Sequence, residues 1–211
     1  MRVLLVNHLP LWAPGGGQQT VELATGLAAL GHEVRAVVAD RAGAAGDPLP
    51  VRRLICRAGD ATADCSFEFP VATRELAGHP TFAELNARQL AEYREQFRRR
   101  IDAEVEQFNP DVIHALHVWI EGHLALETGV PYVLSAVGPE LTAAGESTSL
   151  HALAQQAAEN GGRIVVANEP LRRQVAALFE GVAERLEVAP HPAIARCSAI
   201  YQEVVAARRG L

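Results

Sequence analysis

Short apolar runs of strand length alternate along the chain with longer stretches that carry apolar residues at helical spacing. Seven of the short runs are predicted as β-strands: Arg2–His8, Val34–Ala39, Val51–Arg57, Asp111–Ala115, Tyr132–Ala136, Arg163–Ala167 and Arg185–Ala189. Strands that alternate with helices in this way predict an α/β fold. We expect a doubly wound, mostly parallel sheet of about seven strands with helices on both faces.

The N-terminal segments form one β-turn-α-β unit in this prediction. A glycine-rich turn, Pro14–Gly17, separates the first strand from a helix over Gln18–Leu30. Gly31 is suited to the left-handed conformation that ends many helices. The strand Val34–Ala39 follows, and so short a connection requires the two strands to be parallel with a right-handed crossover.

Three further helices are marked by their apolar spacing or by their ends. Apolar residues recur at every third or fourth position over Thr81–Phe108, and Pro110 ends this helix. Asn168 is expected to cap another helix, and a closing helix begins at about Ala193. The stretch 58–80 has no clear period and is predicted to be a loop.

Glycines follow the first strand, at the edge of the sheet where such folds bind ligands. Gly15, Gly16 and Gly17 allow a ligand to approach the backbone, and the N–H groups that begin the next helix favour an anion such as phosphate. A flexible turn without a ligand is the alternative. A dinucleotide site is disfavoured, because Thr20 stands where that fingerprint needs glycine, although Asp40 is placed like a ribose-binding acid.

Size and charge exclude several classes of protein. The 211 residues are enough for one domain with a sizeable core. The formal net charge of −6, without a basic tail, gives no reason to expect a nucleic-acid partner. The basic run Arg98–Arg100 is flanked by acidic residues, so a solvated helix face is favoured over peripheral membrane contact.

The cysteine and lysine content and the length of the apolar stretches bear on the cellular location and on the catalytic mechanisms that are available. The three cysteines lack a CxxC spacing and are odd in number, which favours reduced thiols in a cytoplasm. No apolar stretch approaches the roughly 20 residues of a membrane span, so no integral membrane segment is expected. The sequence contains no lysine, which excludes a Walker-type phosphate loop and a Schiff-base lysine.

Three longer segments carry an ordered set of motifs. The opening MRVLLVNHLP…PGGGQQTVELATGLAALGHEVRAVVA combines a strand, a proline-glycine loop and a helix that ends in Leu-x-x-x-Gly-His-x-Val. The second is NPDVIHALH…ETGVPYVLSAVGPEL, and the third is IVVANEPLRRQV…RLEVAPHP. In order and spacing, nearly all of residues 1–192 resembles the start of family-4 glycosyltransferases of the GT-B architecture.

This resemblance implies a protein with two Rossmann-like domains, one of which binds the acceptor and the other the donor. Residues 1–192 are similar to the N-terminal, acceptor-side domain, and residues 193–211 to a C-terminal helix that packs back on it. The second domain, which is not in this sequence, holds the nucleotide-diphosphate-sugar donor in that family. The implied reaction is a retaining transfer without a metal or a cofactor, and this chain alone is expected to be inactive.

The resemblance also implies site residues. Those expected beside the donor phosphate are Gly15, Gly16, Gly17 and Gln18. Those expected to bind a small-molecule acceptor are Gln19, His117, Trp119, Gly138 and Glu140. His114, His117 and His123 also raise the possibility of zinc, but no acid or thiol ligand is fixed nearby, so lining of an acceptor pocket is preferred.

Departures from the family pattern leave a second hypothesis open. Where the family has histidine before glycine after the fifth strand, this chain has Val137, which neither donates a hydrogen bond nor exchanges a proton. Its Pro-Asn-Gly motif is replaced by Pro190-His191-Pro192. The alternative is therefore a catalytically inactive Rossmann-like module that docks on a separate catalytic chain.

Overall fold

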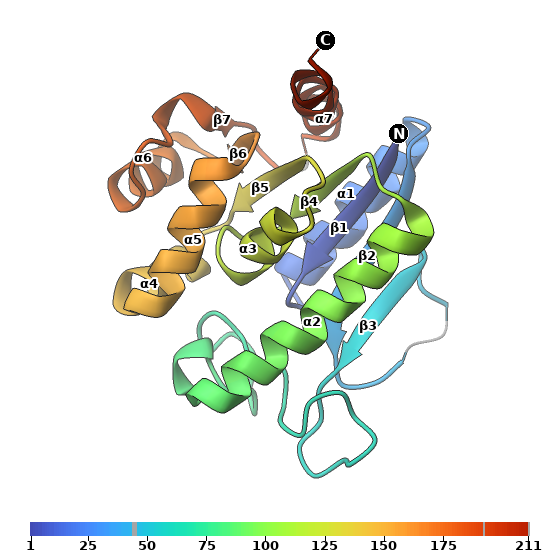
Figure 1. Ribbon diagram of the computed structural model, residues 1–211, viewed down its shortest axis with the longest axis vertical. Helices are drawn as coiled ribbons and strands as arrows, with labels where there is room; N and C mark the ends of the chain where they lie inside the picture. Colours follow the sequence, from blue (N-terminus) through green and yellow to red (C-terminus); the bar gives the residue numbers. More distant parts are fainter. Residues whose placement is uncertain (44–45, 192, 211) are drawn as a thin grey trace.

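A seven-stranded parallel sheet forms the centre of the computed structural model, which describes residues 1–43, 46–191 and 193–210 (Figure 1). Its strands are β1 (Arg2–Asn7), β2 (Glu33–Asp40), β3 (Val51–Ile55), β4 (Val112–Ala115), β5 (Tyr132–Ala136), β6 (Arg163–Val166) and β7 (Leu186–Val188). They lie in the order β3-β2-β1-β4-β5-β6-β7. The predicted α/β class and the doubly wound sheet are confirmed.

Helices cover both faces of this sheet. They are α1 (Gly16–Ala29), α2 (Ala87–Phe108), α3 (Ile120–Glu127), α4 (Pro139–Glu146), α5 (Thr148–Asn160), α6 (Glu169–Leu178) and α7 (Ile194–Arg209). Apolar side chains of α2 to α6 share one buried cluster with the sheet, and those of α1 and α7 share another on the opposite face. The core therefore has two layers separated by the strands.

The strand order reverses between β1 and β4. β1 pairs with β2 on one side, where Val6 lies opposite Val37, and with β4 on the other, where Val6 lies opposite Ala115. The segments that follow β1 and β4 therefore leave the same edge of the sheet side by side. In open parallel sheets this is the place where ligands bind.

The long predicted helix over Thr81–Phe108 is divided in the structure. A short 3-10 helix, Phe82–Glu84, comes first, and α2 begins only at Ala87. The break lies at Asn86, whose side chain accepts a hydrogen bond from the backbone N–H of Gln89 and so caps the new helix. The apolar spacing continues through the break, which is why periodicity alone did not reveal it.

Helices α3, α4 and α5 were not recognised as separate elements in the sequence. α3 is buried around most of its surface, so it has no polar face to produce an amphipathic pattern. The predicted helix after Asn168 is confirmed as α6, with the Asn168 side chain accepting from the N–H of Leu171 at 3.0 Å. The stretch 58–80 is irregular apart from two isolated bridges, which pair Cys65 with Cys56 and Val71 with Thr81.

The basic run on α2 is paired with acids. Arg98 contacts Glu95 and Asp102 on its own helix, and Arg100 contacts Asp64. These pairs agree with the solvated helix face that the sequence predicts. Among the described residues, no helix combines the length and the apolar character that crossing a membrane requires.

Helix α7 packs tightly against α1 and the sheet. The side chain of Val204 occupies the space that a Cβ atom at Gly162 would need, and Ile194 fills the same kind of space at Gly26. Polar contacts cross the same interface: the Tyr201 hydroxyl lies 2.6 Å from Nδ1 of His114. Two glycines and one buried hydrogen bond thus fix the position of the helix.

Ending the chain at residue 191 is expected to lower the melting temperature and to promote association. The truncation exposes the sheet face beneath Ile200, Tyr201, Val204 and Val205, all of which are buried. Burial of each such side chain contributes about 1.5–3 kcal/mol. Thermal denaturation and size-exclusion chromatography measure the effect, with Gln202→Ala on the exposed side of α7 as the control. An unchanged melting temperature in the truncated chain contradicts the expectation.

Candidate functional site

The glycine-rich turn is shaped by two separate steric requirements. Gly15 has a φ of 73°, a conformation that favours glycine. At Gly17, an added Cβ atom would lie 2.1 Å from the carbonyl oxygen of Pro10. Asn7, the last residue of β1, donates from its side-chain amide to the carbonyl of Gly16 at 3.0 Å. The turn is therefore tied to the strand and is not a loose linker.

The start of α1 leaves two backbone donors for a ligand. The N–H groups of Gln18 and Gln19 donate to the carbonyls of Ala13 and Gly15. Within the part of the chain that the structure describes, the N–H groups of Gly16 and Gly17 have no hydrogen-bond partner. Unpaired donors at the positive end of a helix dipole suit an anionic group.

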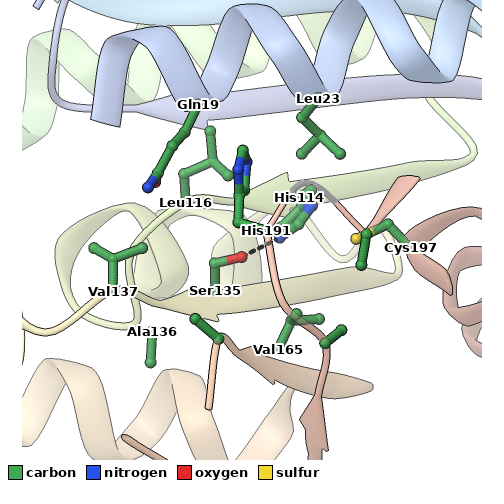
Figure 2. Close-up of a pocket in the computed structure, with 13 residues that line it drawn as sticks. Gln19, Leu23, His114, Leu116, Ser135, Ala136, Val137, Val165, His191 and Cys197 are labelled. Atoms are coloured by element: carbon green, nitrogen blue, oxygen red, sulfur yellow. Dashed lines mark hydrogen bonds between the residues drawn. The ribbon is translucent and has the colours of Figure 1, made fainter. Parts of the chain in front are cut away.

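A cavity of about 80 Å³ lies between α1 and the carboxyl ends of the strands. Figure 2 shows Gln19 and Leu23 on the α1 side, with Ser135 and Val137 on the β5 side and His191 between them. Most of its lining is apolar. The cavity has the composition of a small-molecule site, with few polar groups to set orientation.

The most buried polar group of this cavity is His114, on β4. Its Nε2 lies 2.8 Å from the hydroxyl oxygen of Ser135 (Figure 2). Its Nδ1 is bonded to the hydroxyl group of Tyr201 on α7. Burial lowers the pKa of His114 to about 3, with a smaller contribution from His191. The imidazole is therefore neutral at physiological pH and connects α7 with β5.

The five residues expected to bind an acceptor do not share one cavity. Gln19 lines the cavity beside α1, whereas the side chains of His117 and Trp119 are buried on the other face of the sheet with α2 and α3. Gly138, with a φ of 117°, and the buried Glu140 lie where β5 passes into α4. The sheet thus separates Gln19 from His117 and Trp119.

Glu140 closes the turn after β5. Its two carboxylate oxygens accept hydrogen bonds from the backbone N–H groups of Val137 and Gly138, at 2.8 and 3.0 Å. Burial raises its pKa to about 7, although these N–H groups favour the charged form. The carboxylate holds Val137 in the wall of the cavity.

The candidate acid of a dinucleotide site is occupied by other contacts. One oxygen of Asp40 accepts from the indole N–H of Trp12 and from the backbone N–H of Arg41. The other accepts from the guanidinium of Arg53 at 3.1 Å. Asp40 is therefore part of a buried ion-pair network.

The three histidines considered for zinc do not converge. His114 lies on the α1 and α7 face, and His123 is bonded to Gln156 on α5. His117 instead contacts His8, which follows β1, with ring centroids 4.2 Å apart. Sequence reasoning did not select His8 or Glu121, which lies in the first turn of α3, because nothing in their spacing relates them to His117.

His8, His117 and Glu121 form a fully buried group. Burial lowers the pKa of His8 well below its usual value, and lowers that of His117 to about 3. Burial also raises the pKa of Glu121 to about 8, partly offset by backbone and Trp119 contacts. Both imidazoles are neutral at physiological pH, and the environment penalises a charge on the carboxyl group.

Comparison with known sequences gives one extended match. The sequence profile described as the glycosyl transferase 4-like domain covers residues 14–192. No curated protein matches at a significant level.

Solved structures with a similar fold include several glycosyltransferases. One is a structure of sucrose-phosphate synthase from Thermosynechococcus elongatus, named with the ranges 27–220 and 406–426; it has a TM-score of 0.55 at 15% identity, and the match covers 97% of each chain. The lipopolysaccharide outer core galactosyltransferase WaaB matches at a TM-score of 0.55 and 8% identity. HepE of Anabaena, in complex with UDP, matches at 0.52 and 12%.

Coverage differs among these structures. The match to WaaB covers 91% of this chain but 46% of WaaB, and the match to HepE covers 90% of this chain but 44% of HepE. The chain therefore spans about half the length of those two proteins. At these identities the likeness shows the fold.

Gly17→Ala is expected to destabilise the protein by about 1–3 kcal/mol, because the new methyl group meets a backbone carbonyl that cannot rotate away. Gly145→Ala on α4 is the matched control, since its Cβ atom would meet only Leu178 at 3.9 Å. Chemical denaturation of both variants measures the difference. Equal stability of the two variants would show that the close approach at Gly17 is not required.

Glu140→Gln is expected to reduce the pH dependence of stability. Because the folded-state pKa of Glu140 is raised to about 7 from 4.5, its contribution to stability is full below about pH 4.5 and is lost as the pH rises through 7. The loss amounts to about 3 kcal/mol, and the glutamine variant lacks it. Denaturation at several pH values tests this, with the exposed Glu146→Gln on α4 as control. Parallel pH profiles for wild type and Glu140→Gln contradict it.

Proposed function

Because this chain belongs to the glycosyl transferase 4-like family, we propose that it is the N-terminal, acceptor-side domain of a retaining glycosyltransferase. The donor is a nucleotide-diphosphate sugar and the acceptor a hydroxyl of a small molecule. Structures of similar fold are recorded with UDP and with UDP-glucose, which supports this class of donor. The three free, buried cysteines support a cytoplasmic location.

The observation that carries the proposal is the position of the cavity. It lies between α1 and the carboxyl ends of β4 to β7, and Gln19, in the first turn of α1, lines it. The unpaired N–H groups of Gly16 and Gly17 belong to the same helical turn. An acceptor bound against Gln19 and Ser135 thus has an anion-binding helix start next to it. Gln18, exposed at the same helix start, faces the side from which the donor phosphate approaches in this proposal.

The donor is held largely by a second domain in this proposal. The chain spans about half of WaaB and of HepE, which leaves room in such proteins for a domain of similar size. In this proposal, helix α7, which packs on α1, corresponds to the helix that follows the second domain in complete enzymes of the family. The two-range sucrose-phosphate synthase structure, matched over 97% of both chains, supports this assignment.

A second function is favoured by one residue. Val137 lines the cavity at the position where the family has a histidine. A valine supplies neither a hydrogen bond nor a proton there, and His114 is neutral and fully engaged. An inactive module that binds the small molecule and docks on a separate catalytic chain would tolerate this change.

The two functions are distinguished by acceptor binding and transfer. In an NMR titration of the purified chain with a panel of sugars and sugar phosphates, the proposal expects shifts at Gln19, Ser135 and Val137. Gln19→Ala should abolish these shifts, and Thr25→Ala, which is exposed on α1 and outside the cavity, should retain them. Transfer by the chain together with its donor domain supports the enzyme, and binding without transfer supports the inactive module. Absence of shifts across the panel contradicts both.

The chain alone is expected to release no UDP from UDP-sugars above a blank without protein. Without the donor domain, the transition state lacks most of the contacts that would stabilise it relative to the bound substrates. A coupled assay for UDP release makes the measurement. Turnover that disappears in the Gln19→Ala variant would overturn the expectation.

A further inference from the structure

A dense group of buried polar atoms lies at the strand reversal, on the sheet face opposite the cavity. It comprises His8 after β1, and His117 and Glu121 after β4, with exposed fractions of 0, 3 and 0%. Both ring nitrogens of His8, Nδ1 of His117 and both carboxylate oxygens of Glu121 form no hydrogen bond of normal geometry among the described residues, although the indole N–H of Trp119 interacts with the carboxylate. Five such polar atoms therefore lie in the protein interior, and one from each residue lies within 4.8 Å of the others.

Such an arrangement is costly without a ligand. A buried polar atom that lacks a partner costs about 1–3 kcal/mol, and more when it carries a charge. Aromatic rings surround the group. The ring centroid of Phe82 lies 5.4 Å from that of His8 and 4.7 Å from that of Trp119. Native proteins pair nearly all buried polar groups, so these atoms point to an unassigned ligand.

The donor set identifies the ligand. Two neutral imidazoles and one carboxylate are the ligand types of zinc and of related divalent transition metals, and hard cations such as magnesium prefer oxygen alone. We propose that His8, His117 and Glu121 bind a divalent transition-metal ion of the zinc type. This site is independent of the acceptor cavity and of the proposed glycosyl transfer.

The geometry fits a site that closes slightly on the ion. One ligand atom from each of the three residues lies within 4.8 Å of the others, and Nδ1 of His8 is 3.9 Å from Oε2 of Glu121. Bonds of 2.0–2.1 Å in a tetrahedron give ligand separations of roughly 3.3 Å. Small side-chain rotations supply the difference, and a solvent molecule completes the fourth position.

The ion acts as a cross-link in this proposal. It joins the segment after β1, which leads into the glycine-rich turn, to the first turn of α3. The ion's positive charge offsets the carboxylate, whose burial is otherwise unfavourable. Binding to the folded state alone makes the stability depend on the metal concentration.

Metal titration of the tag-free full chain tests the site. After treatment with a chelator and dialysis, the protein is titrated with Zn²⁺ by calorimetry and with Co²⁺ by visible absorption. The proposal expects one ion per chain, a melting temperature that rises with Zn²⁺, and the intense visible bands of four-coordinate Co²⁺. Folded wild-type protein that takes up no ion and shows no such bands overturns it.

Conservative variants assign the ligands. His117→Asn and Glu121→Gln should each weaken Zn²⁺ binding at least about tenfold, since even partners outside the ligand set typically contribute that much. His123→Asn is the matched control, because His123 lies on the same helix as Glu121 and is bonded to Gln156. Circular dichroism verifies that each variant is folded. If a variant does not fold, the Co²⁺ spectrum of the wild-type protein still tests the metal site. Wild-type affinity in folded Glu121→Gln, or loss of binding in His123→Asn, overturns the assignment.

Discussion

The pairing of β1 with both β2 and β4 is the constraint on which the rest of the structure depends. Because β1 is central, Val3 to Val6 are fully buried and the strand has no free edge. The chain leaves β1 and β4 at the same edge but returns in opposite directions across the sheet. The segments that begin at His8 and at Leu116 are thereby placed next to each other, although about a hundred residues separate them.

The two faces of the sheet make different use of this reversal. On the α1 and α7 face, small and apolar side chains leave a cavity, and its one fully buried imidazole is satisfied by Ser135 and Tyr201. On the α2 and α3 face, His8 and Glu121 are packed among aromatic rings without such partners. The first face contains a small, mostly apolar cavity, and the second contains three residues of the types that bind a transition metal.

Close backbone approach explains why α7 belongs to this fold unit. Only glycine at positions 26 and 162 leaves room for Ile194 and Val204, so the helix sits deeper than ordinary side-chain packing would allow. His114 then links it by a hydrogen bond to the centre of the sheet. The wall of the cavity therefore depends on a helix from the far end of the chain.

The sequence by itself determined the elements with strong local signals. The strand runs, the glycine-rich turn and the Asn168 cap follow from hydrophobic pattern and backbone chemistry, which act over a few residues. The same local reasoning extended the helix through Asn86, because a capping side chain does not interrupt apolar spacing. It also missed α3, whose burial on most sides removes the polar face that marks a helix.

Only the tertiary structure decided which chemically active side chains meet. His114 shares the alternating face of β4 with Val112, toward α7, whereas the chain turns after Leu116 and carries His117 to the opposite face. His114 and His117, only three residues apart in the sequence, therefore lie on different sides of the sheet. His8 and Glu121 join His117 through the β1–β4 pairing, a long-range contact that no local pattern encodes.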